Sequence, residues 1–189
     1  MFNLIIGSIF ISNYVLVQFL GICPSIGVSN KLSTSVGMGI AVTFVTTISS
    51  VIVKLIYDLL LVPYDLVYLR TIVFILVIAS LVQFVEMFMK KTIPSLYDAL
   101  GVYLPLITTN CMVLGVALLN IDKAYSMAET IVNSLSASVG FTIALVLLAG
   151  IREKYEIKNI PESFKGVPIA MLSLGLMAIA FMGFNGLTF

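Results

Sequence analysis

The sequence contains no histidine, no tryptophan and only two cysteines, Cys23 and Cys111. Without histidine, any redox or metal chemistry in this chain depends on those two thiols. Two cysteines are too few for a disulfide framework. Without tryptophan, tyrosine and phenylalanine must supply any aromatic belt at a membrane interface.

Charged residues are also scarce: they make up 10% of the 189 residues, whereas 60% are hydrophobic. An ordinary soluble domain is about 25% charged. A soluble fold of this length cannot bury so much apolar surface, so a bilayer is the expected solvent. The net charge of +1 excludes a nucleic-acid surface that depends on basic residues. No basic segment precedes the first apolar run, so residues from Phe2 onward are interpreted as a retained membrane segment.

Six apolar segments have about the 20 residues that a spanning helix needs. Helices are expected because only helices and closed barrels satisfy the backbone in lipid, and no alternating pattern supports a barrel. We therefore predict an all-α integral membrane protein, a single membrane domain over 1–189 with six transmembrane helices. The predicted spans are about 2–28, 34–61, 71–89, 96–119, 127–151 and 167–187.

Each cysteine lies in a stretch with the same pattern, in which three residues and then Gly-Val follow the cysteine. The first stretch contains Gly21, Cys23 and Pro24, and the second follows Pro105 and the polar residues 108–110. Proline lacks an N–H and disfavours helical geometry at the residue before it. We therefore predict that helices 1 and 4 are broken near the cysteines.

A second match relates the two halves of the chain: Ser-Val-Gly begins at residue 35 and recurs at residue 138. Three spans per half is an odd number, so the halves would insert with opposite orientation. We predict a 3+3 inverted repeat, with repeat 1 about 1–90 and repeat 2 about 91–189. Such folds place their functional site near the midplane, in discontinuous helices. A ligand shared by the two cysteines would require both thiols near that midplane.

The distribution of lysine and arginine predicts the orientation. With six spans, seven basic residues lie on one side and three on the other, so the larger set is placed in the cytoplasm and both termini on the outer side. The seven are Lys31, Lys90, Lys91, Arg152, Lys154, Lys158 and Lys165, and the three are Lys54, Arg70 and Lys123.

Cysteines beside helix breaks suggest a ligand site. Exposed N–H groups at the start of a half-helix favour thiolate over thiol, and a thiolate pair can hold a soft metal or half of an iron–sulfur cluster. Such a cluster normally needs four cysteines, so this chain would need a partner or a second copy of itself. The alternative is structural, because buried free cysteine is common and usually inert.

Polar and small residues beside the breaks are candidate neighbours of the sulfur atoms. The polar ones either bond the thiolates or only join helices, as polar groups in membranes often do. The candidate neighbours are Asn110, Thr109, Gly27 and Gly115, with Asn13, Gln18 and Thr108 as further polar residues of the breaks.

Glu86 is the only carboxylate well inside a predicted span, and an intramembrane acid is by default a candidate ion site. Lys90 at i+4 favours instead an ion pair near the cytoplasmic end. Several small residues are better explained as close-packing positions than as ligand contacts. They are Gly37, Gly39, Gly140, Ala144, Gly175 and Gly183.

Five stretches resemble the RnfA/NqrE family, and the resemblance covers essentially the whole chain. Cys23-Pro24 and Leu69-Arg70-Thr71 resemble the A subunit of the Rnf complex more than its counterpart in the Na⁺-pumping quinone reductase. The five stretches are 13–24, 104–111, 114–120, 149–154 and 180–184.

The resemblance implies a membrane subunit of a complex that passes electrons between ferredoxin and NAD⁺, coupled to Na⁺ or H⁺ translocation. Cys23 and Cys111 match the family's cluster ligands. Together with two cysteines of the sister E subunit, they would hold one [2Fe–2S] cluster in mid-membrane. This chain alone would have no catalytic residue and no complete active site.

The resemblance also implies the B, C, D and G subunits and membrane lipid as partners, in the bacterial cytoplasmic (inner) membrane. Two other functions stay open on the residues. One is a small inverted-repeat secondary transporter or channel without a redox centre, since broken helices in inverted repeats are typical of transporters. The other is a purely structural subunit.

Overall fold

The computed structural model describes residues 2–64, 67–92, 105–156, 161 and 164–183. Every regular element among these residues is a helix, which confirms the predicted all-α class. The first half contains α1 (Phe2–Ile6), η1 (Gly7–Ile11), α2 (Ile22–Val28), α3 (Leu32–Ile56), η2 (Tyr57–Leu61), η3 (Val67–Leu69) and α4 (Arg70–Thr92). The second half contains α6 (Pro105–Thr108), α7 (Cys111–Asp122), α8 (Met127–Glu156) and α9 (Val167–Met182).

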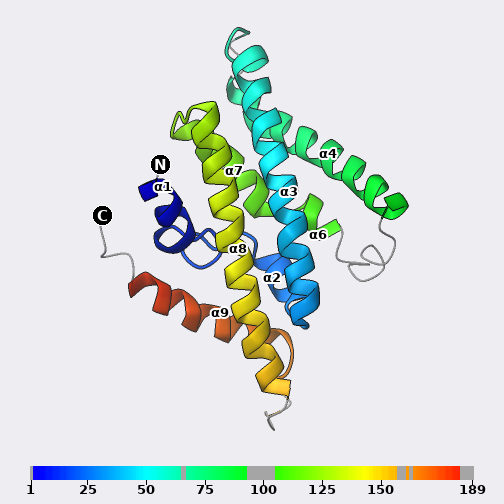
Figure 1. Cartoon of the computed structure of the whole chain (residues 1–189), viewed down its shortest axis with the longest axis vertical. Helices are drawn as coiled ribbons and strands as arrows, with labels where there is room; N and C mark the ends of the chain where they lie inside the picture. Colours follow the sequence, from blue (N-terminus) through cyan, green and yellow to red (C-terminus); the bar gives the residue numbers. More distant parts are fainter. Residues whose placement is uncertain (1, 65–66, 93–104, 157–160, 162–163, 184–189) are drawn as a thin grey trace.

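The two long helices α3 and α8 form the centre of the molecule and run in opposite directions side by side (Figure 1). The two helices pack closely at Gly39, where an added Cβ would lie only 2.5 Å from Cγ2 of Thr142. Small residues permit this kind of contact between membrane helices. The antiparallel pair agrees with opposite insertion of two halves, and the full inverted repeat stays a prediction.

The buried core lies mainly on the facing sides of α3, α7 and α8. Met38 and Val42 of α3, Met112 of α7, and Phe141 and Leu145 of α8 are fully buried. Large apolar side chains are exposed on the outside of the molecule, for example on α4 and α9. That distribution suits a protein whose outer surface contacts lipid.

Among the described residues, three helices are long and apolar enough to cross a membrane: Leu32–Leu61, Val67–Phe88 and Met127–Tyr155. Two shorter apolar helices, α7 with 12 residues and α9 with 16, occupy parts of the fourth and sixth predicted spans. The first predicted span is divided among α1, η1 and α2. Helices 1 and 4 are thus broken as predicted, and six complete crossings stay a prediction.

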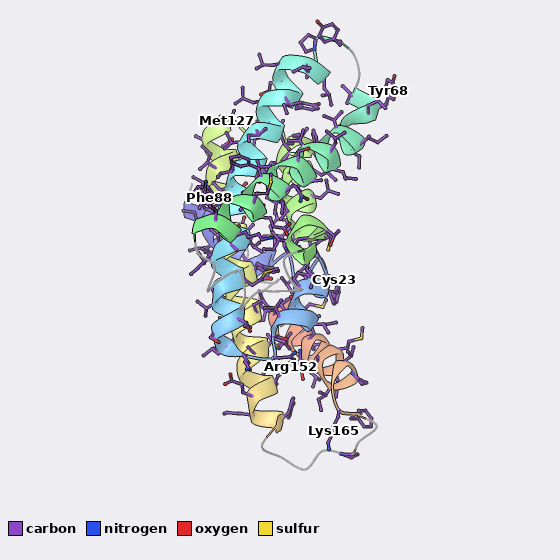
Figure 2. All side chains as sticks on the ribbon, turned by 90° about the vertical axis from the view of Figure 1, so that its right-hand side faces the viewer. Cys23, Tyr68, Phe88, Met127, Arg152 and Lys165 are labelled. Carbon is purple, nitrogen blue, oxygen red and sulfur yellow. The ribbon has the colours of Figure 1, made fainter. Side chains whose placement is uncertain are left out.

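The polar ends of the long axis are distinct. Arg152 and Lys165 lie towards one end, Tyr68 lies at the other, and Cys23 lies between them (Figure 2). At the Tyr68 end, Arg70 forms an ion pair with Asp122 at 2.6 Å. Arg152 and Lys165 therefore lie at the end opposite Arg70, as the orientation rule expects for these three residues, while the membrane side of each end stays a prediction.

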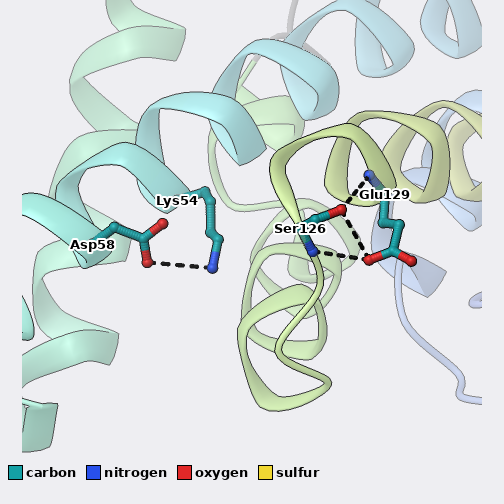
Figure 3. A network of polar contacts seen from close by, with 4 residues as sticks. All are labelled: Lys54, Asp58, Ser126 and Glu129. Atoms are coloured by element: carbon teal, nitrogen blue, oxygen red, sulfur yellow. Dashed lines mark hydrogen bonds and ion pairs between the residues drawn. The ribbon is translucent and has the colours of Figure 1, made fainter.

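The start of α8 shows how the sequence sets a helix end. The backbone N–H of Ser126 donates to the carboxylate of Glu129 at 2.9 Å, and the N–H of Glu129 donates to the Ser126 hydroxyl at 3.4 Å. This reciprocal pair is a capping box. On the adjacent helix, Lys54 pairs with Asp58 at 3.3 Å near the same end (Figure 3).

Candidate functional site

Asn13 holds the first helix break together. Its side chain is fully buried, and its amide donates to the carbonyl oxygens of Ile9 and Gly140, both at 3.0 Å. Its Oδ1 accepts the N–H groups of Val15 at 3.0 Å and Leu16 at 3.3 Å. Asn13 therefore satisfies backbone groups of the break and bonds the break to α8. The sequence left open whether Asn13 bonds a sulfur or joins helices, and its bonds in the structure join helices.

Gly21 closes this break and caps α2. Its φ is +86°, a left-handed conformation that glycine adopts without steric cost. A Cβ at this position would lie 2.9 Å from Cε2 of Phe141 and 3.2 Å from Cβ of Met112. Both the backbone conformation and the close packing therefore require glycine where the chain enters the half-helix that carries Cys23.

The position of this break corrects one prediction. Pro24 does not remove helical geometry from Cys23, because α2 begins at Ile22 and includes both residues. Proline is tolerated in the first turn of a helix, where its missing N–H would have had no intrahelical partner. The break ends at Gly21, and Cys23 lies in the first turn of α2.

The second break is short and begins α7. Asn110 is the N-cap, and its Oδ1 accepts the N–H of Met112 at 3.0 Å, the usual stabilisation of a helix start. Cys111 is the first residue of α7. The Nδ2 of Asn110 is buried and has no hydrogen-bond partner among the described residues.

The two breaks meet. The N–H of Gly21 donates to Sγ of Cys111 at 2.9 Å, although 90 positions separate the two residues in the sequence. The Cys111 side chain is half-buried, whereas Cys23 is exposed and lies midway along the molecule (Figure 2). Cys111 also faces a cavity of about 290 Å³, whose other lining residues are Ile75, Ile78, Ala79, Thr109, Asn110 and Leu114.

The other candidate neighbours divide into two groups. Thr109 and Asn110 line the cavity beside Cys111. Gly115 is instead a packing position, since a Cβ there would lie 2.5 Å from Cδ1 of Leu20 in the first break. Gly27 is half-buried in α2.

Two further polar residues do not contribute a described sulfur contact. Gln18 is exposed, and the Thr108 side chain lies outside the described residues. Glu86 is half-buried on α4, and its pairing with Lys90 stays a prediction.

Of the glycines expected to pack closely, Gly175 and Gly183 have open space around them, because a Cβ added at either position would meet no described atom within 4 Å. That expectation was wrong for these two glycines.

Arg152 is a contact that the sequence interpretation missed. Its Nη1 donates to the carbonyl oxygen of Ile26 and to the Ser29 hydroxyl, both at 2.7 Å. Arg152 thereby holds the C-terminal end of α2 from α8. The adjacent Glu153 accepts the N–H of Leu32 at 3.1 Å, which fixes the start of α3 in the same place. In the sequence, Arg152 was only a charged residue at the end of an apolar span, and it was used only to predict the orientation.

A buried polar network between η1, α7 and α8 was also missed. Asn133 accepts the Ser8 hydroxyl at 2.6 Å and donates to Asn120 at 2.6 Å and to the Tyr14 hydroxyl at 3.3 Å. Asn120 in turn donates to the Ser134 hydroxyl at 3.2 Å. The signal in the sequence that could have revealed this network was the presence of Asn120 and Asn133 in or next to apolar spans.

The donor set fits half of an iron–sulfur or soft-metal site. Two thiols come from two helix starts, one sulfur accepts a backbone N–H, and the adjacent Asn110 amide still has an unused donor. In the part of the chain that the structure describes, no group of three or more His, Cys, Asp or Glu side chains could hold a metal ion. A complete thiolate site here therefore needs ligands from another chain.

Comparison with known sequences identifies the family. A family model described as "Rnf-Nqr subunit, membrane protein" matches residues 1–188. The chain belongs to the Rnf-Nqr family. This match confirms both the resemblance in the cysteine-bearing stretches and the membrane character expected from composition.

Relatives of this Rnf-Nqr chain share more than half of its residues. The A subunit of the Na(+)-translocating ferredoxin:NAD(+) oxidoreductase complex of Acetobacterium woodii is 58% identical over 184 residues, which cover 97% of this chain and 96% of the relative. The A subunit of the ion-translocating oxidoreductase complex of Proteus mirabilis is 54% identical, with coverage of 97% and 95%. The protein of the same name from Pseudoalteromonas translucida is also 54% identical, with the same coverage.

Proposed function

We propose that this chain is the A-type membrane subunit of an ion-translocating oxidoreductase. It would relay electrons across the membrane between ferredoxin and NAD⁺ through a [2Fe–2S] cluster, coupled to Na⁺ or H⁺ translocation. The names of its relatives support both a role in an oxidoreductase complex and ion translocation. Its proposed partners are a sister E subunit, the B, C, D and G subunits, and lipid of the bacterial inner membrane.

The observation that carries the proposal is the hydrogen bond from Gly21 N–H to Cys111 Sγ at 2.9 Å. Gly21 lies two positions before Cys23, so this bond joins the backbone of one cysteine segment to the sulfur of the other. It places the start of the half-helix that carries Cys23 directly beside the sulfur of Cys111. The bond supports a single ligand site that uses both thiols.

The exposure of the two cysteines supports a shared site. Cys23 is exposed and Cys111 is half-buried, so Cys23 remains accessible to a group that a second chain also binds. When bound, the cluster supplies a one-electron carrier partway through a hydrocarbon core about 30 Å thick. The N–H donor on Cys111 stabilises negative charge on that ligand, and such hydrogen bonds help to set the potential of a cluster.

The decisive experiment compares Cys23→Ser and Cys111→Ser with the wild type in the purified complex. We expect each substitution to abolish one [2Fe–2S] signal in electron paramagnetic resonance and to lower the iron content, with ferredoxin-dependent NAD⁺ reduction falling to background. Ser33→Ala, at an exposed position at the start of α3, is the control and should retain both. Native gels check that the complex still assembles.

Three outcomes would contradict the proposal. Full turnover and an unchanged signal in the Cys23→Ser/Cys111→Ser complex would make both cysteines structural. A complete cluster on this chain in the absence of the partner would exclude shared ligands. Solute flux in proteoliposomes without iron at the cysteines would instead favour the transporter or channel.

A further inference from the structure

Four buried hydroxyl groups on the two central helices lack partners among the described residues. They belong to Thr46, Ser49 and Ser50 of α3 and to Thr130 of α8, and each of these residues is at most 2% exposed. Burying a hydroxyl without a partner is unfavourable, so four of them in one region require an explanation.

Other hydroxyls of the same helices show that a local solution exists. Thr43 and Thr47 of α3 donate to the carbonyl oxygens four residues earlier, at 2.7 and 2.8 Å. Ser138 and Thr142 of α8 do the same, at 2.7 and 2.8 Å. Ser and Thr side chains in helices commonly satisfy themselves in this way. The four unpartnered hydroxyls are buried but do not make such a bond.

The contacts between the helices show which turns of α3 and α8 lie beside each other. Gly39 meets Thr142, and Thr47 of α3 and Leu135 of α8 line the same surface groove. Because the helices are antiparallel, the next turn of α3 at Ser50 lies beside the turn of α8 that precedes Leu135. Figure 3 shows the end of this stretch, where Lys54 on α3 and Glu129 on α8 lie on neighbouring helices.

The direction of the side chains agrees with this placement. Thr46 and Ser50 come seven and eleven residues after Gly39, about two and three helical turns, so all three share one stripe of α3 that faces α8. On α8, Thr130 lies one turn before Ser134, which bonds Asn120 of α7. Thr130 therefore lies near the bond that joins α8 to α7, and Thr46 and Ser50 lie on the side of α3 that faces α8. This region is the junction of α3, α7 and α8, beside the network of buried asparagines.

We propose that this junction binds a desolvated monovalent cation of the Na⁺ type. All the groups offered are hard, neutral oxygen donors, which suit alkali and alkaline-earth cations rather than soft metals. Ca²⁺ and Mg²⁺ sites rely on carboxylates, and the nearby Glu129 carboxylate is engaged by Ser126. Neutral hydroxyls match a single positive charge and do not bind an additional proton at neutral pH.

This site is separate from the cysteine site. It lies towards the end of the molecule marked by Lys54 and Asp58, whereas Cys111 begins α7 at the opposite end of that helix from Asn120. The binding itself does not depend on electron transfer. Its use as a station for the transported ion rests on the proposed function.

The test measures Na⁺ binding by the oxidised, purified complex, without ferredoxin or NAD⁺. Thermal unfolding midpoints are recorded against NaCl, with choline chloride keeping the ionic strength constant, alongside equilibrium binding of radioactive sodium. We expect Thr46→Val and Thr130→Val to raise the Na⁺ concentration for half-maximal stabilisation about tenfold, because ligand binding stabilises only the state that binds. Thr46→Ser keeps the hydroxyl and should bind as the wild type does.

Thr43→Val and Thr47→Val are the matched controls, since these threonines lie on the same helix but bond their own backbone. They should leave Na⁺ binding unchanged. If Thr46→Val and Thr130→Val bind Na⁺ as the controls do, water rather than a cation occupies the junction and the inference is wrong. If Na⁺ binding is lost as expected but no complex couples electron transfer to ion transport, the inference stands and the proposed function fails.

Discussion

The two cysteine-bearing breaks reach similar ends by different means. The first is a long irregular segment from Ser12 to Gly21, held by four hydrogen bonds of Asn13. The second interrupts the helix only at Thr109 and Asn110 and is stabilised by a single side-chain cap. Both deliver a cysteine into the first turn of a helix. The side-chain cap of the second break is local, whereas the first break is bonded to α8.

The dependence of the first break on α8 is the more instructive difference. Asn13 bonds the carbonyl oxygen of Gly140, and Arg152, also on α8, bonds the end of α2 at Ile26. The half-helix that carries Cys23 is thus held at both ends by the opposite half of the chain. Cys111, in contrast, is placed by its own helix. Damage to α8 should therefore displace Cys23 more than Cys111.

Asn13→Ala should give the largest effect. Four backbone groups in and near the first break would lose their partner in a buried region, and we expect a loss of about 3 kcal/mol in the free energy of unfolding. Unfolding of the purified complex in an SDS titration measures it. Asn30→Ala, at an exposed position before α3, should change stability little. An equal effect of the two substitutions would contradict the role of Asn13.

Gly21→Ala should be next. A left-handed backbone costs a non-glycine residue energy, and the new Cβ would contact Phe141, so we expect a loss of about 2 kcal/mol. The shift should also weaken the bond to Cys111 and alter any cluster signal. Gly150→Ala, a helical position with open space around its Cβ, should be neutral or slightly stabilising. A neutral Gly21→Ala would show that the break tolerates another conformation.

The sequence predicted the position of the second break better than that of the first. Pro105 and Asn110 act locally, through a missing N–H and an N-cap, so their effects follow from neighbouring residues. The effect of Pro24 was misplaced because proline in a first turn stabilises a helix start as readily as it ends a helix. Sequence patterns do not reveal that Asn13 bonds Gly140, because that contact depends on how η1 packs against α8.

The site shows the same division. The repeated Cys-x-x-x-Gly-Val pattern pointed to both thiols, and their role as ligands stays a prediction. Helix-break chemistry pointed to Asn110, which the structure shows as the N-cap of α7. Arg152 was not selected, because its contact with Ile26 forms only when the end of α8 packs beside α2. The unpartnered hydroxyls were likewise invisible, since the sequence does not show which serines bond their own helix.

Arg152→Gln tests the second attachment of α2. A charged donor to Ile26 and Ser29 would be lost, and we expect about 1.5 kcal/mol of destabilisation. The cluster signal should shift or broaden, because Cys23 lies one turn from the contact. Lys154→Gln, which removes an exposed charge nearby, is the control. If the two substitutions affect the signal equally, the contribution of Arg152 is only its charge.

Asn110 gives the smallest effect on stability and the sharpest comparison between the breaks. Asn110→Ala removes the cap on Met112 and should cost about 1 kcal/mol. Asn110→Ser keeps a capping oxygen but lacks the Nδ2 donor, so stability should be near that of the wild type. If Nδ2 donates to a sulfur of the bound cluster, both substitutions should lower its reduction potential, because a donor to sulfur stabilises the reduced form.

A potential lowered in both Asn110 variants, measured by redox titration of the signal, would separate this donor from its cap. A potential lowered only in Asn110→Ala would mean that the cap alone positions Cys111. Thr109→Val at the adjacent position lining the same cavity serves as the comparison for a change of polarity without loss of the amide. The short break would then differ from the long one in function as well as in structure: Asn13 uses all its hydrogen bonds for the fold, whereas Asn110 keeps one for the ligand.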